Sequence, residues 1–237
     1  MAAVEDEIAP IRSLLSDRHS FQIGNKPAYS GYIAREPVML IQSGIGMINA
    51  AQAITAVIEH YSVKLIINTG CSGVFLESGL SIGDIGIATS ETDIHSGIES
   101  LSGENSVDPL PFPLIQTTNE YYFAQYPTSK KLTQQAFDIV KDHFQSRFTI
   151  KQTPFLTVST ITASQERVKA LYRHYKAGME NMEGAGVAHV AIQYDIPFIE
   201  IRTASNIVGD RNKTNWRLKD AFKRSAEAIQ LLMYYRH

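Results

Sequence analysis

The chain has 237 residues and a formal net charge of −2, from 22 Lys and Arg residues against 24 Asp and Glu. That length suits one large α/β domain, and the balanced charge argues against a nucleic-acid partner. The single cysteine excludes an internal disulfide, and no Cys/His cluster has metal-ligand spacing, so we expect neither a metal nor an organic cofactor. No apolar run is long enough to cross a membrane, and the acidic N-terminus does not resemble a signal peptide. These features predict a cytoplasmic protein with no membrane partner.

Strand-like and helix-like segments alternate along the chain. Short β-branched runs predict strands, and apolar residues spaced three and four apart predict helices. In chain order we predict a strand at Val38–Gln42, a helix at Asn49–Tyr61, strands at Val63–Asn68 and Ile85–Thr89, a helix at Lys130–Phe144, a strand at Phe155–Thr160, a helix at Glu183–Tyr194, a strand at Pro197–Thr203 and a helix at Leu218–Met233. This alternation predicts one domain over residues 1–237, with a central sheet covered by helices on both faces.

Two regions do not fit the alternation. The acidic turn Ala3–Ile8 has no strand before it, although an α/β domain usually begins with one. Either the first strand is missing from the chain or the sheet is completed in another way. The region from Glu99 to Thr128 contains the Pro-rich segment Asp108–Pro113 and is predicted to be a long loop. Loops of that length in compact domains often serve function.

Two glycine turns follow neighbouring predicted strands. Ser43–Gly46 leads into a helix, and Thr69–Gly73 follows the next strand. A dinucleotide fingerprint needs a third glycine where Asn49 stands, so the first turn is either a packing turn or a set of N–H groups that face a polar ligand. Two such turns after adjacent strands predict a ligand crevice at the strand ends. Cys71, in the second turn, is interpreted as a packed thiol rather than a nucleophile.

The stretch from Gly178 to Asp210 carries the most informative polar residues. Glu183 opens a helix, Arg202 interrupts an apolar strand, and Asn206 follows near that strand's end. A carboxylate can accept hydrogen bonds from both hydroxyls of a sugar diol, and an amide can donate to a 6-oxopurine. The alternatives are a surface glutamate in a first helical turn, a structural salt bridge and a turn-forming asparagine.

At this point the motifs resemble a known family. Five segments, in order along nearly the whole chain, are similar to the nucleoside phosphorylase/nucleosidase superfamily: Ser43–Gly46, Ile66–Gly70, Val74–Gly86, Met182–Ala185 and Arg202–Asn206. Within it, the ending Ser205–Arg211, followed by Trp216, most resembles the futalosine hydrolases, with the methylthioadenosine/adenosylhomocysteine nucleosidases as close relatives. The resemblance implies a three-layer α/β/α sandwich around a central mixed, partly barrel-like sheet. It also implies a homodimer or larger homo-oligomer, in which a neighbour's loop completes the pocket.

The resemblance implies roles for the sugar and the water. Glu183 matches the glutamate that binds the ribose hydroxyls, and Met182 matches the residue packed beneath the ribose. Glu7 matches the glutamate that orients or deprotonates the attacking water, with Glu5 as the alternative. Arg202 is placed near that water and the catalytic glutamate. All of these serve a small-molecule nucleoside substrate.

Two asparagines distinguish this chain from its relatives. The adenine-cleaving nucleosidases carry Asp where Asn206 stands, and an amide suits hypoxanthine because it donates to a 6-oxo group. The phosphorylases place an arginine near Asn68, and a neutral side chain there favours water over phosphate as the nucleophile. We therefore predict hydrolysis of futalosine, with release of hypoxanthine, as in menaquinone biosynthesis. The alternatives are a methylthioadenosine/adenosylhomocysteine nucleosidase, a purine nucleoside phosphorylase and an inactive nucleoside-binding protein.

The remaining candidates are placed by the same resemblance. Cys71 stands where the related nucleosidases have serine, and Ser72 and Gly73 follow it in the candidate pocket. Further residues are assigned to the base, to the benzoate of futalosine, to the pocket rim and to the core: Thr160 and Thr162 for the base, Arg211 and Lys213 for the benzoate, His95 and Ser96 for the rim, and His189 for the core. A solvated charged loop is the alternative for the benzoate pair.

Overall fold

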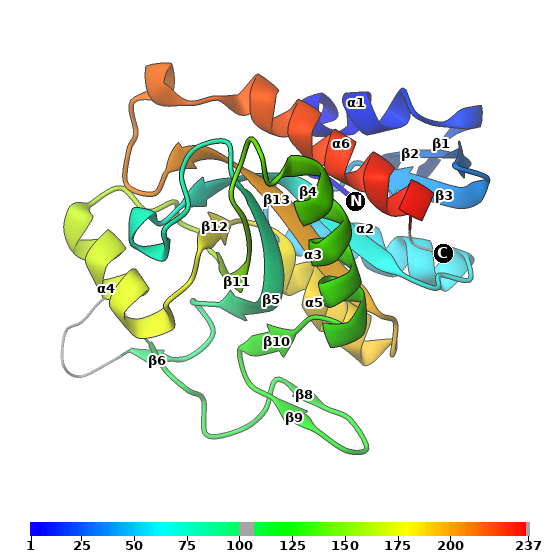
Figure 1. Ribbon diagram of the computed structural model, residues 1–237. Helices are drawn as coiled ribbons and strands as arrows, with labels where there is room; N and C mark the ends of the chain where they lie inside the picture. The colour runs from blue at the N-terminus through cyan, green and yellow to red at the C-terminus, as the bar shows by residue number, and fades with distance from the viewer. Residues whose placement is uncertain (100–106, 236–237) are drawn as a thin grey trace.

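A curved mixed sheet forms the centre of the computed structural model, which describes residues 1–99 and 107–235 (Figure 1). The strand order is β10-β5-β11-β12-β4-β13, and β5 also pairs with β13, so five of the strands close into a ring. The strands are β4 (Ile66–Val74), β5 (Ile85–Asp93), β10 (Gln125–Pro127), β11 (Ile150–Thr157), β12 (Met179–Asn181) and β13 (Phe198–Ile207).

Helices cover both faces of this sheet. On one side α1 (Glu5–Arg12), α3 (Lys130–Phe144) and α6 (Leu218–Tyr235) share a hydrophobic core with β5 and β13. On the other side α2 (Met47–His60) packs against α5 (Gly184–Gln193). Helix α4 (Gln165–Tyr175) contributes to a third cluster with β11. The predicted three-layer α/β/α architecture with a central mixed sheet is confirmed.

A small antiparallel sheet precedes the main one. It consists of β1 (Ser16–Ile23), β2 (Lys26–Ile33) and β3 (Glu36–Ile41). The expected strand before the acidic segment does not occur as such, and that segment is helix α1 rather than a turn. Instead Ala2 bridges Gln42 in parallel, and the N–H of Thr69 donates to the carbonyl of Met1 at 3.0 Å. The extended residues before α1 therefore complete the strand pairing and hold α1 against β4.

The predicted strand boundaries were wrong in one instructive place. We expected a glycine turn at Thr69–Gly73, but β4 continues through it to Val74, because β12 and β13 pair with it on both sides. Glycine and serine have little strand preference, so this pairing is visible only in three dimensions. Strand β13 likewise runs on to Ile207, which places Asn206 within the sheet.

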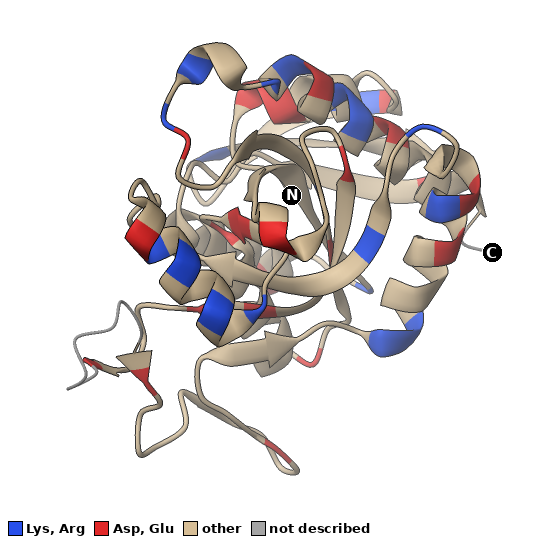
Figure 2. Ribbon diagram, turned by 60° about the vertical axis from the view of Figure 1, so that its left-hand side comes forward, with Lys and Arg blue, Asp and Glu red and all other residues tan. Residues whose placement is uncertain are grey.

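The expected long loop contains short paired segments. These are β6 (Ile98–Glu99) with β7 (Val107–Asp108), and β8 (Ile115–Gln116) with β9 (Tyr121–Tyr122); residues 100–106 of the predicted loop lie outside the described residues. Two 3-10 turns complete the chain, at Leu76–Ser78 and Lys213–Asn215. Within the described ranges, no helix is both long and apolar enough to span a bilayer. Figure 2 shows basic and acidic residues mixed along the outer helices.

Candidate active site

A buried arginine organises the candidate site. Arg202, on β13, is 2% exposed, and its Nε donates to Glu200 Oε1 at 2.6 Å. Its two terminal nitrogens donate to Glu183 Oε2 at 3.1 Å and to the carbonyl of Cys71 at 2.9 Å. Burial alone would lower the pKa of Arg202, but the carboxylates of Glu200, Glu183 and Glu7 raise it above its ordinary value. The guanidinium is therefore permanently charged, and each of its nitrogens already has a partner.

Glu183 joins two segments that are far apart in sequence. It is the N-cap of α5, so the helix begins one residue later than predicted. Its Oε1 accepts from the N–H of Gly46 at 3.0 Å, at the N-terminus of α2. The N–H groups of Glu183 and Gly184 in turn donate to Asn181 Oδ1, at 2.9 and 2.7 Å. Gly46 and Arg202 thus fix the carboxylate, Asn181 fixes the backbone that carries it, and half-buried Met182 packs against the hydrophobic cluster at α4.

Glu7 is held by backbone donors. Its Oε2 accepts from the N–H groups of Ala3 and Val4 at 3.0 and 3.2 Å, and its Oε1 accepts from the N–H of Cys71 at 2.9 Å. Gly70 has φ +153°, and any Cβ there would collide with Glu7 Oε1. A carboxylate has about four lone-pair sites, so one site remains for a water molecule. The alternative candidate, Glu5, is an exposed residue paired with Arg12 and does not enter this cluster.

Cys71 lies beside Glu7, and we expect its thiol to be unreactive. Burial, together with the charge of Glu7, raises the pKa of Cys71 to about 12. Only the thiolate is a good nucleophile, so this residue packs and offers its backbone groups.

A pair of buried carboxyls lies behind Arg202, and sequence reasoning missed both. Glu91 and Glu200 are fully buried. A Cβ at Gly184 would collide with Glu91 Oε1 and lie 2.5 Å from Glu200 Oε2. One oxygen of each carboxyl therefore lies next to Gly184, close to the other. Glu91 also accepts from Thr157 Oγ1 and Asn181 Nδ2, each at 2.7 Å. Burial, followed by the charge of Glu200 and a hydrogen bond to it, raises the pKa of Glu91 well above its usual range. Two buried carboxyls this close repel each other when both are ionised, so we expect the pair to hold one proton between them.

Asn68 belongs to this network. It is fully buried, and its Nδ2 donates to Glu200 Oε1 at 2.8 Å. The predicted substrate-binding asparagine thus bonds to the same Glu200 oxygen as Arg202 Nε does. The signal that could have revealed Glu200 is the one that revealed Arg202, a charge inside the apolar run that precedes Thr203.

A second group of polar residues lies further along the same strands. Asn206 is half-buried, its Oδ1 accepts from Ser205 Oγ at 2.8 Å, and its Nδ2 donates to the carbonyl of Ile207 at 3.2 Å. A Cβ at Gly73 would lie 3.4 Å from Asn206 Nδ2. Ser72, buried next to Gly73, accepts through its carbonyl from Ser205 Oγ at 3.1 Å. These residues lie together where β4 and β13 pair, near the ends of the two strands.

The outlying candidates are more scattered. Thr162 is 1% exposed and bonded to Glu180, whereas Thr160 is exposed. Arg211 is exposed and lies over the ring of Trp216 at 5.1 Å. Lys213 is exposed, and Ser96 is half-buried beside Asp93. His95 is exposed and accepts from the N–H of Ser159. His189 is half-buried and contacts the hydroxyl of Tyr126 at 3.1 Å.

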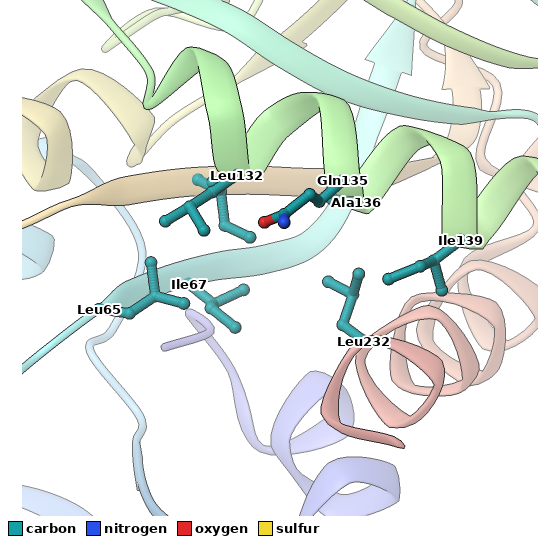
Figure 3. A pocket seen from close by; sticks show the side chains of 8 residues that line it. Leu65, Ile67, Leu132, Gln135, Ala136, Ile139 and Leu232 are labelled. Atoms are coloured by element: carbon teal, nitrogen blue, oxygen red, sulfur yellow. The ribbon is translucent and has the colours of Figure 1, made fainter. Parts of the chain in front are cut away.

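Two hollows elsewhere do not contain the carboxylate cluster. Figure 3 shows a small one between α3, β4 and α6, lined by Leu65, Ile67, Leu132, Gln135, Ala136, Ile139, Ile199 and Leu232. Its walls are almost entirely aliphatic, which offers nothing to a polar ligand. A wider groove lies between β8–β9 and the end of α5. In residues 1–99 and 107–235, no three His, Cys, Asp or Glu side chains are arranged to hold a metal ion.

A profile of the Phosphorylase superfamily matches residues 1–234 of the chain. The chain belongs to this superfamily. It is 27% identical to the 5′-methylthioadenosine/S-adenosylhomocysteine nucleosidase of Oceanobacillus iheyensis, over 97% of the chain and 95% of that protein. It is also 28% identical to the futalosine hydrolase of Thermus thermophilus, over 81% of the chain and 80% of that protein.

Solved structures place this phosphorylase-superfamily chain on the same fold. The nucleosidase of Neisseria meningitidis, in complex with methylthio-immucillin-A, superposes with a TM-score of 0.83 at 24% identity, covering 98% of the chain and 96% of that structure. The futalosine hydrolase of Helicobacter pylori gives a TM-score of 0.81 at 22% identity, covering 98% and 94%. At these identities the likeness concerns the fold.

Proposed function

We propose that the protein hydrolyses the N-ribosidic bond of a 6-oxopurine nucleoside, futalosine or one similar to it. The observation that carries the proposal is the buried cluster of Glu7, Glu183 and Arg202. Cleavage of an N-riboside develops positive charge on the sugar. Glu7, Glu183 and the Glu91–Glu200 pair together contribute three negative charges against one positive charge on Arg202. A buried excess of negative charge stabilises a cation-like sugar in the transition state.

The roles follow from the free acceptor sites. Glu183 Oε1 accepts from the N–H of Gly46, and Oε2 accepts from Arg202. Each oxygen retains a lone pair that can accept from a ribose hydroxyl. Glu7 has one free site, which we assign to the attacking water. The water oxygen bonds to the sugar C1′, its proton passes to Glu7, and the C1′–N9 electron pair leaves with the base. The base then takes its proton from solvent.

Water is favoured over phosphate because the buried cation of the site, Arg202, is already paired with Glu183 and Glu200. Every nitrogen of Arg202 is already bonded to Glu183, Glu200 or the carbonyl of Cys71. Among the described residues, Arg202 is also the one basic side chain that is buried. A phosphate dianion would enter beside Glu7 and Glu183, whose charges would repel it, and the charge of Arg202 is already balanced by Glu183 and Glu200.

The preference for a 6-oxo base depends on Asn206. Its amide can donate to N7 and O6 of hypoxanthine, whereas an aspartate could accept from a 6-amino group. The likeness to the futalosine hydrolase of Thermus thermophilus is consistent with this preference. The competing function is that of a methylthioadenosine/adenosylhomocysteine nucleosidase, which the names of many similar curated proteins favour.

A product assay tests the proposal. Purified protein is offered futalosine, inosine, methylthioadenosine and adenosylhomocysteine, each with and without phosphate, and the bases are separated by chromatography. We expect hypoxanthine from futalosine, at a rate that phosphate does not change. Adenine from methylthioadenosine instead would establish the competing function, and a requirement for phosphate would contradict the hydrolytic mechanism.

The Asn206→Asp variant tests the role of the amide. It should shift the ratio of kcat/KM values from the 6-oxo toward the 6-amino nucleoside by ~10-fold or more, since a mismatched hydrogen bond in a binding site costs at least that. An unchanged ratio would remove Asn206 from base recognition.

We also infer that the protein is a homodimer or a larger homo-oligomer. Ile45 and Ile48 lie close in sequence to Gly46, whose N–H donates to Glu183, and they are 56% and 84% exposed. A partner subunit covering them would shield the sugar site from solvent. Light scattering with size-exclusion chromatography measures the mass, and a monomer would contradict this inference.

A further inference from the structure

The two N–H groups along one edge of Arg202 are divided between two carboxylates. Nε and Nη2 lie on the same edge of a guanidinium, where together they form a fork that can bind a single carboxylate through two parallel bonds. Here Nε donates to Glu200 Oε1 at 2.6 Å, and Nη2 donates to Glu183 Oε2 at 3.1 Å. The shorter bond goes to Glu200, and Glu183 accepts one bond from the fork instead of two.

Glu200 is held in this position from the strand beside it. It is fully buried on β13, and its register partner on β4 is Asn68. Side chains of register partners on neighbouring strands stand on the same face of a sheet. Asn68 Nδ2 donates at 2.8 Å to Glu200 Oε1, the atom that also accepts from Arg202 Nε. The sheet thus fixes the oxygen that occupies one half of the fork.

The other oxygen of Glu200 lies against the start of α5. A Cβ at Gly184 would be 2.5 Å from Glu200 Oε2, and Gly184 directly follows Glu183 in the chain. The missing side chain at residue 184 lets Glu200 come close to the backbone that carries Glu183. The two carboxylates can therefore contact the same edge of Arg202 from neighbouring positions.

Without Glu200, the whole fork of Arg202 would be open to Glu183. Two parallel bonds bind a carboxylate more strongly than one, so Glu183 would turn to accept from Nε as well as from Nη2. To do so, its Oε1 would leave the N–H of Gly46, from which it now accepts at 3.0 Å. Each lone pair that Arg202 takes is one that a ribose hydroxyl can no longer use.

Stability alone does not account for a carboxylate at position 200. Glu200 and its neighbour Glu91 are both 0% exposed. Taking charges out of water is costly, and a hydrophobic side chain of similar volume is often at least as stabilising as a buried ion pair. Departures from the rules of a stable core are expected at functional sites. The placement of Glu200 therefore indicates a role in the site.

We propose that Glu200 is a positioning residue for sugar recognition: it occupies Nε of Arg202, so that Glu183 is oriented by a single bond and keeps acceptor sites for the ribose hydroxyls. This assignment rests on the proposed function and adds Glu200, with Asn68 behind it, to the residues that determine sugar binding. In this role Glu200 acts through Arg202 and not by touching the substrate. Its effect should therefore depend on the ribose hydroxyls and not on the base.

The test is a double-mutant cycle between residue 200 and the ribose 2′-hydroxyl. Calorimetry measures the dissociation constants of 9-deazainosine and its 2′-deoxy form for the full-length protein; a carbon–carbon bond joins sugar and base in both, so neither is hydrolysed. Glu200→Met fills a similar volume without a strong acceptor for Nε. Loss of the 2′-hydroxyl should weaken binding ~10-fold or more in the wild type, as loss of a charge-assisted hydrogen bond does. In Glu200→Met the loss should be less than ~3-fold, and equal losses in both proteins would overturn the proposal.

Two further variants separate positioning from stability. Glu200→Gln keeps an acceptor for Nε and should therefore keep the 2′-hydroxyl effect to within ~3-fold of the wild type. Glu166→Gln changes an exposed glutamate in α4 and should behave as the wild type. If Glu200→Met does not fold, the proposal is still overturned by a wild type that binds both analogues equally, or by a Glu200→Gln protein that no longer distinguishes them.

Failure of this inference differs from failure of the proposed function. Neither cleavage nor the choice of base enters the cycle, and 9-deazaadenosine replaces 9-deazainosine if the protein prefers a 6-amino base. Release of hypoxanthine from futalosine, with equal 2′-hydroxyl effects in wild type and Glu200→Met, would overturn the role of Glu200 and leave the hydrolase intact. A protein that cleaves no nucleoside, but loses the effect in Glu200→Met, would overturn the hydrolase and keep the positioning role. No binding of any analogue would contradict both.

Discussion

Replacing Glu200 by glutamine tests the proton shared in the buried carboxyl pair. A glutamine oxygen can still accept from Arg202 Nε and Asn68 Nδ2, as Glu200 Oε1 does at 2.6 and 2.8 Å. Its NH2 group then takes the place of Oε2, the buried oxygen that lacks a donor from any amide or hydroxyl, and donates to Glu91. The pair keeps a single negative charge, now on Glu91, without taking a proton from solvent.

The sign of the effect follows from the raised pKa of Glu91. Below about pH 4.3 both the native and the unfolded chain hold this proton. Above it the unfolded chain releases the proton while the native pair keeps it, so the native state binds more protons and its stability falls as the pH rises. The loss is ~1.4 kcal/mol per pH unit until the pH reaches the native pKa. Glu200→Gln removes this loss. The difference between its free energy of unfolding and that of the wild type should therefore grow in favour of the variant by ~1.4 kcal/mol for each pH unit.

The assay is urea unfolding of both proteins at several pH values between about 5 and 7, followed by circular dichroism. Because other groups titrate in both proteins alike, only the difference between the two free energies is used. Glu166→Gln, in which an exposed glutamate is changed, should run parallel to the wild type. Glu200→Ala should lose ~3–5 kcal/mol, since it leaves Arg202 underpaired. Parallel curves for Glu200→Gln, or a loss of ~3 kcal/mol at pH 7, would refute the shared proton.

Three further changes probe the rest of the site. Gly184→Ala should destabilise the protein by ~1–3 kcal/mol in urea, because its methyl collides with the carboxyl pair; unchanged stability would contradict that geometry. Glu7→Gln should lower kcat by ~10²- to 10⁴-fold, as loss of a general base does, with little change in the dissociation constant of the nucleoside, and a full retention of kcat would exclude it as the base. Cys71, whose pKa is raised to about 12, should resist alkylation by iodoacetamide at neutral pH, as followed by mass spectrometry; rapid alkylation of the native protein would show an accessible thiolate.

The sequence predicts those parts of this molecule whose signals are local. The helix at Lys130–Phe144 has the predicted bounds, because its apolar spacing is unbroken. Glu183 and Arg202 were found as charges in apolar surroundings, and the structure joins them in an ion pair. Strands β1 and β2 were missed, since their exposed and half-exposed residues lack the β-branched runs that were sought. The register that aligns Glu180 with Asn206 was out of reach because three strands far apart in the chain must first assemble.

Glu200 shows a signal that was present but not used. Side chains two residues apart on a strand lie on the same face, so Glu200 and Arg202 are neighbours on any extended segment, and their opposite charges indicate a buried pair. Glu91 gives no comparable signal, since it stands among the polar residues at the end of β5. Its partner lies on β13 and is brought close only when β5 and β13 close the ring.

The short strand β12 connects the two halves of the site. Its residues alternate in direction, so Glu180 stands on the face of Gly73 while Asn181 donates to Glu91 and holds the N–H of Glu183. Asn181 therefore connects the buried pair with Glu183, the carboxylate that we propose to bind the sugar. Buried negative charge at this place opposes folding, and the same charge favours a cation-like sugar. Under the proposed function the buried carboxylates therefore lower stability in favour of catalysis, and only a change that keeps the partners of Arg202, such as Glu200→Gln, should recover part of that stability.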